Sequence, residues 1–535
     1  MLSTMQDVPL TLTHVLERGR RHFAGSEVVT WEGSGSRRSD FGMVADRAAQ
    51  LAAALRRLGV ARGDRVGTLC WNNQEHLEAY LAIPCMGAVL HTLNLRLPLE
   101  QLAWVINHAE DRVLIVDGSL LLLYRAVAPQ LTTVRHVVVT GDVDPSVLDG
   151  ELLYEQLLSS EPPDHSWPAL DEREAAAMCY TTGTTGDPRG VVYSHRSTVL
   201  HSLAGWGAFG LREADRILPI VPMFHVMAWG IPYIGWMVGA DLLLTDRHLQ
   251  PGPLVRFIEA ERPTYAAGIP LIFTWILDHA ATHPTDLSSL RMALCGGSAV
   301  PRSLIEAFQE RHGVTLIQAW GMTEMSPMGT IAEPPKGVPR DEEMAWRTLA
   351  GRVTPLVELR ATGEDGSVLP TDGVAVGEIE ARGPWVTASY HRDPAEDCFH
   401  DGWLRTGDVG SLDPRGFLQI RDRSKDVIKS GGEWISSVEL ESLLAGHPAV
   451  ADAAVIAVPD DRWQERPLAA VVLHPDAVEG PAELRAYLAA RVSRIWLPER
   501  WAMVEVLPKT SVGKQDKKVL RSLYAEGRLP VVECR

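Results

Sequence analysis

Apolar and polar positions in the first part of the chain follow two spacings. Residues 47–59 (RAAQLAAALRRLG) place Ala and Leu at helical spacing and close on a glycine after two arginines, which predicts a helix and its end. The runs 113–117 (VLIVD) and 134–141 (VRHVVVTG) are short, apolar and β-branched, and each predicts a strand. Residues 291–320 continue as strand, glycine turn, helix and strand. This order predicts a mainly parallel sheet covered by helices.

The pattern changes twice in the second half. Residues 352–420 hold turn clusters between short alternating strands, which predicts a small antiparallel, β-rich module. After about residue 421, helical and strand patterns alternate in what we expect to be a compact α+β unit. The predicted fold class is therefore α/β, with layered, mainly parallel sheets in a large N-terminal domain and a small C-terminal domain.

Length and charge limit the function classes. With 535 residues the chain exceeds what one core usually supports, and 46% hydrophobic and 22% charged residues are ordinary for a globular protein. The formal net charge of −17 repels nucleic acid at long range, so we expect no nucleic-acid partner. A phosphorylated ligand would need a site built locally against that field.

The cysteines and the N-terminus indicate the compartment. Six cysteines are scattered with no Cys-x-x-Cys pair, which argues against a disulfide framework or a zinc site. The first residues show no signal-peptide pattern. We expect a reducing, cytoplasmic location.

One long apolar stretch needs a separate interpretation. Residues 217–240 contain only His225 and Tyr233 as titratable groups, which is nearly long enough to cross a bilayer. Three prolines and three glycines would break a lipid-exposed helix repeatedly, so we predict a buried core segment. Peripheral membrane contact stays open as an alternative.

Three segments carry candidate chemistry. Residues 180–190 (YTTGTTGDPRG) combine glycines with threonine hydroxyls that can surround phosphate oxygens, although the spacing is not that of a Walker A loop. Residues 318–324 (QAWGMTE) offer a ring that can stack on a base and a carboxylate that can hold Mg²⁺. Residues 403–408 (WLRTGD) end in a carboxylate suited to a ribose diol. Singly, each segment is also compatible with an ordinary turn or strand-end loop.

Together, and in this order, these segments resemble the adenylate-forming superfamily of acyl-CoA synthetases, adenylation domains and luciferase-like enzymes. The resemblance continues through residues 422–435 (DRSKDVIKSGGEWI) and 508–514 (PKTSVGK). It implies an N-terminal domain over residues 1–421, with the β-rich module at about 352–420, a hinge at 422–426, and a mobile C-terminal domain over 427–535.

The resemblance also implies an activity. Family members join a carboxylic acid to the AMP part of Mg-ATP with release of pyrophosphate, and an acceptor such as CoA then displaces AMP. The implied catalytic residues are Lys514, Glu324, Thr323 and His225, and the implied metal ligands are Thr184 and Glu324. Lys514 would counter charge as the adenylate forms. The implied ATP- and AMP-binding residues are Thr181, Thr182, Gly183, Thr184, Thr185, Gly186, Gly297, Ser298, Ala299, Gln318, Ala319, Trp320, Gly321, Met322, Thr323, Asp408 and Arg423.

For the second step, the resemblance places the hinge at Lys425. Rotation about it would bring the second-step residues to the site, where glycines leave room for the pantetheine arm of CoA; these residues are Lys429, Gly431, Gly432 and Trp434. Two positions depart from the family pattern. Arg189 stands where lysine is usual, which keeps the charge and changes its geometry. Trp320 stands where tyrosine is commonest, which keeps the stacking surface.

The acid itself is predicted from residues 222–230 (PMFHVMAWG). They resemble the acyl pocket of fatty acyl-CoA synthetases, in which His225 would border the carboxylate and Trp229 would guard the tunnel. A core histidine is the alternative for His225. We expect a medium- or long-chain fatty acid as substrate, ahead of a short substituted or aryl acid. An inactive binding protein of the family, a carrier-protein acceptor and a homodimer stay open.

Overall fold

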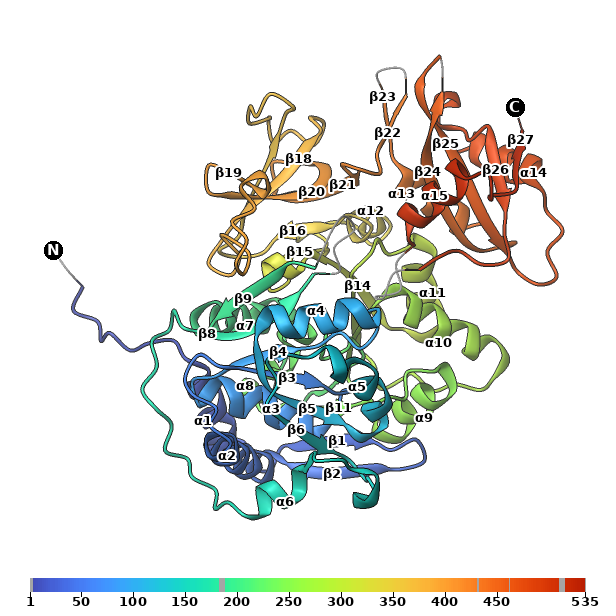
Figure 1. The fold of residues 1–535 in the computed structure, drawn as a ribbon. Coiled ribbons are helices and arrows are strands. Elements are labelled where there is room, and N and C mark those ends of the chain that lie inside the picture. Colours follow the sequence, from blue (N-terminus) through green and yellow to red (C-terminus); the bar gives the residue numbers. More distant parts are fainter. Residues whose placement is uncertain (1–2, 182–187, 431–432, 461, 510–514, 535) are drawn as a thin grey trace.

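Three β-sheets organise the molecule, and Figure 1 shows the C-terminal sheet standing beside a larger body. The computed structural model describes residues 3–181, 188–430, 433–460, 462–509 and 515–534. Within these ranges the sheets have seven, fourteen and six strands. The mixed α/β class predicted from the sequence is confirmed, together with a separate C-terminal domain.

The seven-stranded sheet is parallel except for the last two strands of its order, which pair antiparallel. Its strand order is β7-β6-β5-β3-β4-β8-β9. The predicted strands at 113–117 and 134–141 are confirmed within it. Its strands are β3 (Arg65–Leu69), β4 (Val89–Thr92), β5 (Asp111–Asp117), β6 (His136–Thr140), β7 (Leu152–Leu153), β8 (Ala175–Tyr180) and β9 (Gly190–Ser194).

The fourteen-stranded sheet changes from parallel to antiparallel pairing along its length. Its parallel part is built from βαβ units, as predicted for residues 291–320. The antiparallel part begins after the strand that ends at Gly321. The parallel part and its first hairpin comprise β1 (Glu27–Trp31), β2 (Ser36–Asp40), β10 (Arg216–Pro219), β11 (Asp241–Leu244), β12 (Tyr265–Gly268), β13 (Met292–Gly296) and β14 (Thr315–Gly321). The antiparallel part comprises β15 (Met328–Ile331), β16 (Gly351–Val353), β17 (Glu358–Thr362), β18 (Gly377–Arg382), β19 (Phe399–His400), β20 (Trp403–Leu412) and β21 (Phe417–Arg423).

The β-rich module expected at about 352–420 is antiparallel, as predicted, but it has no sheet of its own. β16 pairs with β15 on one side and with β21 on the other, so the module extends the large sheet. The short strand β16 supplies this connection because its two edges both hydrogen-bond.

Helices fill the space between the two large sheets and cover their outer faces. The shared core takes alternate residues from both sheets and the apolar faces of α1, α2, α3, α7 and α8. Val28 and Leu242 point into this core, whereas the adjacent Val29 and Leu243 point to the outer cover of α9, α10 and α11. The helices are α1 (Leu12–His22), α2 (Phe41–Arg57), α3 (Gln74–Cys85), α4 (Leu99–Ala109), α5 (Leu121–Val127), α6 (Tyr154–Ser159), α7 (His195–Phe209), α8 (Ile231–Val238), α9 (Pro251–Glu261), α10 (Pro270–Thr282), α11 (Arg302–His312) and α12 (Glu343–Arg347).

Helix ends follow local capping chemistry. The predicted helix at 47–59 is confirmed, but it begins at Phe41 because the Asp40 carboxylate accepts the Met43 N–H at 2.7 Å. α11 ends at Gly313, which is left-handed as a C-terminal glycine stop requires.

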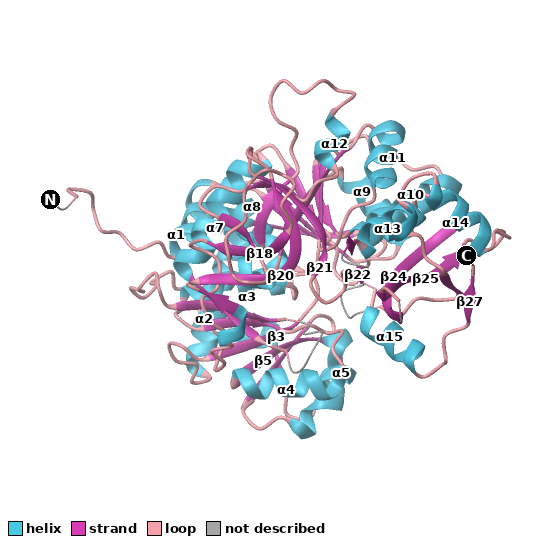
Figure 2. Cartoon of the chain, turned by 90° about the horizontal axis from the view of Figure 1, so that it is seen from above, coloured by secondary structure: helices cyan, strands magenta, loops and turns pink. Residues whose placement is uncertain are grey.

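The C-terminal unit is a curved sheet with helices against it, seen apart from the body in Figures 1 and 2. The helix and strand patterns predicted after residue 421 are confirmed here. Its elements are β22 (Ile428–Ser430), β23 (Glu433–Ile435), α13 (Ser437–Ala445), β24 (Val450–Asp460), β25 (Gln464–Leu473), α14 (Pro481–Ala489), β26 (Arg500–Met503), α15 (Lys517–Ala525) and β27 (Val531–Glu533).

The apolar stretch 217–240 is buried, as predicted. It contributes β10, a short helix η4 (Val226–Gly230) and α8, and all the residues of α8 are buried. Residues Val226–Trp229, named here the left-handed turn, have φ between +37° and +57°. Four consecutive non-glycine residues in this region are costly. No helix in the described part of the chain is long and apolar enough to span a membrane.

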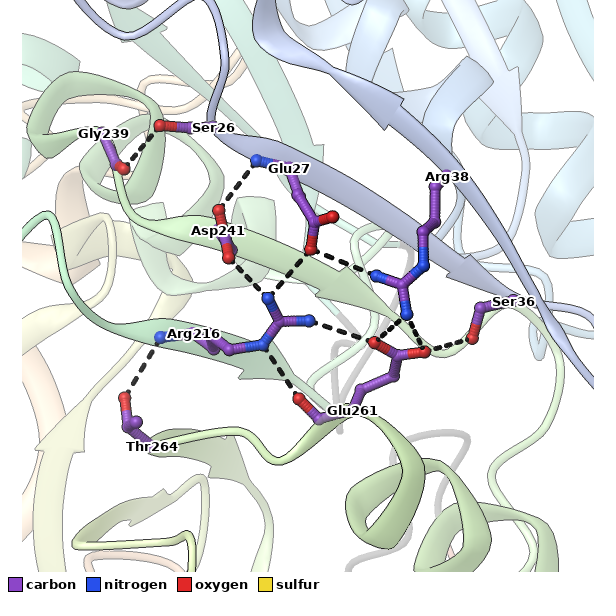
Figure 3. A network of polar contacts seen from close by, with 9 residues as sticks. All are labelled: Ser26, Glu27, Ser36, Arg38, Arg216, Gly239, Asp241, Glu261 and Thr264. Carbon is purple, nitrogen blue, oxygen red and sulfur yellow. Dashed lines mark hydrogen bonds and ion pairs between the residues drawn. The ribbon is translucent and has the colours of Figure 1, made fainter.

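A network of ion pairs links the elements at one edge of the large sheet (Figure 3). The Arg216 guanidinium lies 2.6 Å from Asp241, 2.9 Å from Glu27 and 3.0 Å from Glu261. Arg38 also reaches Glu261, at 2.6 Å. The Glu261 side chain is only 5% exposed, so its charge depends on these two arginines. The network thereby joins β1 and β2 to β10, β11 and the end of α9.

We expect Arg216→Met to destabilise the large domain by roughly 2–4 kcal/mol, because it leaves three carboxylates with one cation fewer. Urea unfolding followed by tryptophan fluorescence measures this. Arg302→Met is the control, because its pair with Glu306 is solvent-exposed and its loss should cost less than about 0.5 kcal/mol. Equal effects of the two substitutions would contradict the assigned importance of the network.

Candidate functional site

The carboxyl ends of β12, β13 and β14 meet at one edge of the large sheet. Gly268 pairs with Cys295, and Gly296 pairs with Ala319, so the loops that follow these strands emerge together. Ligands of open α/β sheets bind at this edge. The backbone is tightly packed here: a Cβ on Gly321 would lie 1.8 Å from the Pro327 carbonyl oxygen. Glycine is therefore required at position 321.

The predicted adenine segment Gly297–Ala299 lies exposed at this edge. Gly297 is left-handed, with φ +89°, which turns the chain out of β13. Gln318 supports this loop. Its Oε1 accepts the Val300 N–H at 2.7 Å, and its Nε2 donates to the Leu349 carbonyl at 2.7 Å. Gln318 thus positions the adenine segment with both ends of its amide.

Trp320, Asp408 and Arg423 form a connected group. The Trp320 indole N–H donates to one Asp408 oxygen at 2.8 Å, and the Arg423 guanidinium lies 2.7 Å from the other. β20 and β14 are four places apart in the sheet order, or roughly 19 Å if the sheet were flat. The sheet must therefore curl until β20 faces the end of β14. Asp408 is 4% exposed and keeps lone pairs for further donors.

Glu324 lies in the short helix η5 (Thr323–Met325), just beyond β14. The Tyr390 hydroxyl donates to its carboxylate at 2.8 Å. Burial raises the pKa of Glu324, and the Tyr390 hydrogen bond opposes that rise. The neighbouring Thr323 is buried, and its carbonyl accepts the Tyr193 hydroxyl at 2.8 Å. Met322 donates its N–H to Pro327 across the same turn.

A cleft of about 440 Å³ opens beside Glu324. Its walls are β9, the loop at 384–392 and the Glu324 turn. The adenine segment, Trp320 and Asp408 do not line it. The carboxylate expected to bind metal therefore faces a cleft that the residues expected to bind the nucleoside do not line.

The predicted phosphate loop is described only at its ends. Thr181 donates its N–H to the Arg189 carbonyl at 2.9 Å, and its hydroxyl accepts the Arg189 N–H at 3.2 Å, which closes the base of the loop. Thr182, Gly183, Thr184, Thr185 and Gly186 lie outside the described residues. The Arg189 guanidinium faces Cys398 Sγ at 2.8 Å and Asp393 at 3.3 Å.

The predicted acyl-pocket residues lie on or beside the left-handed turn. The buried Trp229 ring approaches β13, where a Cβ on Gly296 would be 3.5 Å from it. His225 is half-buried directly before the turn, and its carbonyl accepts the Ala228 N–H at 3.0 Å. The turn thus carries Trp229 to the same sheet edge as the adenine segment.

Of the predicted second-step residues, the structure describes the side chain of Lys429. Lys429 on β22 lies 2.9 Å from Glu364, in the turn after β17. Trp434 pairs with Lys429 in β23. Gly431, Gly432 and Lys514 lie outside the described residues. Burial lowers the pKa of Lys425, whose carbonyl accepts a hydrogen bond from Arg521.

Three basic residues near the C-terminus, Lys509, Lys517 and Arg521, form ion pairs. Lys517 is half-buried and lies 2.7 Å from Glu441, while Arg521 pairs with Asp426 and Lys509 with Asp452. These cations stabilise the C-terminal unit, so they add little free positive charge for an anionic ligand.

Comparison with known proteins identifies the family. The model of AMP-binding enzymes matches residues 16–391, and that of the AMP-binding enzyme C-terminal domain matches residues 439–514. The chain is an AMP-binding enzyme of the adenylate-forming superfamily.

Relatives of this AMP-binding enzyme match nearly its whole length. A 3-methylmercaptopropionyl-CoA ligase of Ruegeria lacuscaerulensis is 43% identical, with 98% of this chain and 99% of the relative covered. A long-chain-fatty-acid–CoA ligase of Thermus thermophilus is 44% identical, with 98% and 97% covered. The crystal structure of an anthranilate CoA ligase in complex with anthranoyl-AMP has a TM-score of 0.89 at 27% identity, with 98% and 99% covered.

Sequence reasoning missed several residues around the site of this AMP-binding enzyme. Tyr390 holds Glu324 from 66 positions away, and Cys398 contacts Arg189 from 209 positions away. Neither lies in a segment with a recognisable spacing. The Trp320 indole N–H was also missed as a donor, although the change from the usual tyrosine signalled a different polar contact.

We expect Gly321→Ala to destabilise the AMP-binding enzyme by roughly 2–3 kcal/mol, because the new methyl group overlaps the Pro327 carbonyl. Urea unfolding measures the loss. Gly207→Ala on α7 is the matched control: nothing lies near its Cβ, and alanine should stabilise that helix by about 0.5–1 kcal/mol. A tolerated Gly321→Ala would contradict the close approach described here.

Proposed function

We propose that the chain is an ATP-dependent, AMP-forming acid–CoA ligase. It joins a carboxylic acid to AMP with release of pyrophosphate and then transfers the acyl group to the CoA thiol. The observation that carries the proposal is the convergence of Trp320, Asp408 and Glu324 around the end of β14. Full-length relatives that are named as CoA ligases support it.

The nucleotide would lie along the sheet edge. The Trp320 ring offers a stacking surface beside Gly297, Ser298 and Ala299, and Ala319 and Gly321 line the strand beneath. Asp408, fixed by Trp320 and Arg423, has acceptor capacity left for a ribose diol. The triphosphate would then reach the loop that begins at Thr181.

Mg²⁺ fits the donor chemistry of this site. Magnesium in nucleotide sites uses one or two carboxylates together with phosphate oxygens, and Glu324 supplies a buried carboxylate next to the proposed phosphate position. Thr184 would be the second protein ligand. Bound there, the ion would neutralise charge on the departing pyrophosphate. Tyr390 holds the Glu324 carboxylate in place for it.

The two steps would use different faces of the C-terminal domain. We propose that residues 427–535 rotate about Lys425 relative to residues 1–421. Lys514 would stabilise the forming adenylate, and after rotation Lys429, Gly431, Gly432 and Trp434 would face CoA. The ion pair between Lys429 and Glu364 must open for that rotation.

The acid would enter beside His225 and Trp229 with an uncharged tail. The stretch 217–240, to which both residues belong, contains no Asp, Glu, Lys or Arg, which suits a hydrocarbon rather than an ammonium group. Two relatives are named for a thioether acid and for long-chain fatty acids, and both kinds of acid have an uncharged tail. The cavity next to the left-handed turn leaves room for about one water molecule, so we propose a short linear acid ahead of a long-chain one.

The proposal is tested with the purified protein, ATP, Mg²⁺, CoA and a panel of acids. The panel runs from propionate to palmitate and includes 3-(methylthio)propanoate and benzoate. We expect acid-dependent release of AMP and pyrophosphate, strongest for short linear acids. No acid-dependent AMP from any panel member would contradict the ligase function.

We expect Lys514→Ala to slow adenylate formation by about 100-fold or more, because a cation at the developing charge is lost. The variant should still convert supplied acyl-adenylate to thioester. Quenched-flow measurement of each half-reaction checks this. Lys509→Ala, which loses only a pair with Asp452, is the control and should keep both steps. Equal loss of both steps in Lys514→Ala would contradict the rotation between half-reactions.

We expect Tyr390→Phe to move the acidic limb of the kcat/KM profile toward higher pH by roughly one unit. The Glu324 carboxyl, whose pKa burial already raises, loses the hydrogen bond that favours its ionised form. Since the ionised form is the metal ligand, activity should fall earlier as pH decreases. Tyr193→Phe is the control, because its hydroxyl bonds a main-chain carbonyl instead. A limb that stays in place in Tyr390→Phe would exclude Glu324 as the titrating group.

A further inference from the structure

A small cavity lies between α7 and the left-handed turn. Its volume is about 10 Å³, which is room for a single water molecule. Its walls include His201 from α7 and Val226, Met227 and Gly230 from the turn. Val226, Met227 and Gly230 flank Trp229 in the chain, so the cavity adjoins the predicted acyl pocket.

The hydroxyl groups around this cavity are already used. Each donates its hydrogen to a main-chain carbonyl, so none is left to donate into the cavity. The pairs are Tyr193 with Thr323 at 2.8 Å, Thr198 with Ser194 at 2.9 Å, Tyr233 with Tyr80 at 3.0 Å and Ser326 with Trp385 at 3.0 Å.

His201 differs from these groups. His201 is only 2% exposed, and its Nε2 has no hydrogen-bond partner among the described residues. Burial lowers the pKa of His201 to about 4, so the ring is neutral at pH 7 and carries one N–H and one lone pair. A buried polar atom without a partner is unfavourable unless a ligand or water satisfies it.

The imidazole of His201 is also held in place. A Cβ on Gly230 would lie 2.7 Å from its Nδ1, so only glycine lets the ring approach the turn this closely. The Trp385 ring meets it edge-on, with centroids 6.0 Å apart. A fixed polar atom in an otherwise satisfied, uncharged cavity can discriminate between ligands.

We propose that His201 is a specificity-determining residue that hydrogen-bonds an uncharged acceptor heteroatom, a thioether or ether, in the tail of the acid. The inference rests on the proposed ligase function and names the class of acid. A charged tail is excluded because no charged side chain lines the cavity among the described residues. A plain hydrocarbon tail that took the place of the water would leave the His201 nitrogen unsatisfied.

The test compares acids that differ in one chain atom. Two heteroatom acids, 3-(methylthio)propanoate and 3-methoxypropanoate, are compared with pentanoate by their kcat/KM values. We expect the wild-type protein to prefer a heteroatom acid by about three- to tenfold, the range of one neutral hydrogen bond. His201→Leu should bring this ratio to about one, and His201→Gln should restore part of it.

His195→Gln is the matched control. His195 lies on the same helix, is fully buried and also has an unpartnered Nε2 among the described residues, but it does not line the cavity. Its substitution should leave the heteroatom preference unchanged. A ratio that survives His201→Leu, or that falls equally in His195→Gln, would overturn the inference.

A second measurement needs no variant. The ether oxygen is moved one carbon at a time along acids of constant length. A fixed donor predicts one preferred position, whereas an apolar cavity predicts that every ether acid is poorer than its hydrocarbon counterpart. The second result overturns the assignment of His201 while acid-dependent AMP release still supports the ligase. No AMP from any acid overturns both.

Discussion

The hydrogen bond between the Trp320 indole and the Asp408 carboxylate depends on the shape of the whole large sheet. The two residues belong to strands that are separated by β21, β16 and β15, so the bond forms only if the antiparallel part curls over the end of the parallel part. Gly296 and Gly321 let the backbone pack tightly at the end of β14, where Trp320 lies. The candidate nucleoside site is thus a consequence of how one continuous sheet bends.

Charge is organised locally in this acidic protein. Lys509, Lys517 and Arg521 near the C-terminus have acidic partners, and Arg216 and Arg38 hold the sheet edge together. A net charge of −17 is compatible with the proposed sites for anionic ligands, because these would rely on loops, on the carboxylate proposed to bind metal and on single cations rather than on bulk positive charge. Arg189 follows the same rule, since Asp393 and Cys398 contact its guanidinium at the base of the predicted phosphate loop.

The left-handed turn connects the sheet edge with the interior of the body. Its unfavourable backbone is stabilised by burial on all sides, and it positions Trp229 at β13 and Gly230 against His201. Glu324 and Ser326 are two residues apart, yet Glu324 faces the larger cleft while Ser326 lines both the cleft and the small cavity. The proposed metal, nucleoside and acyl positions therefore surround one short turn after β14.

Local patterns in the sequence determined the helices, most strands, the glycine turns and the family, because spacing, capping and motif order are encoded within a few residues of each other. They also identified Trp320, Glu324 and Asp408 as site candidates. Only the tertiary structure decided which groups meet: Tyr390 with Glu324, Cys398 with Arg189, and Glu364 with Lys429. It also decided that the antiparallel strands extend the large sheet and that the His201 Nε2 lacks a partner among the described residues. These facts depend on strand register and sheet curvature, which no local pattern specifies.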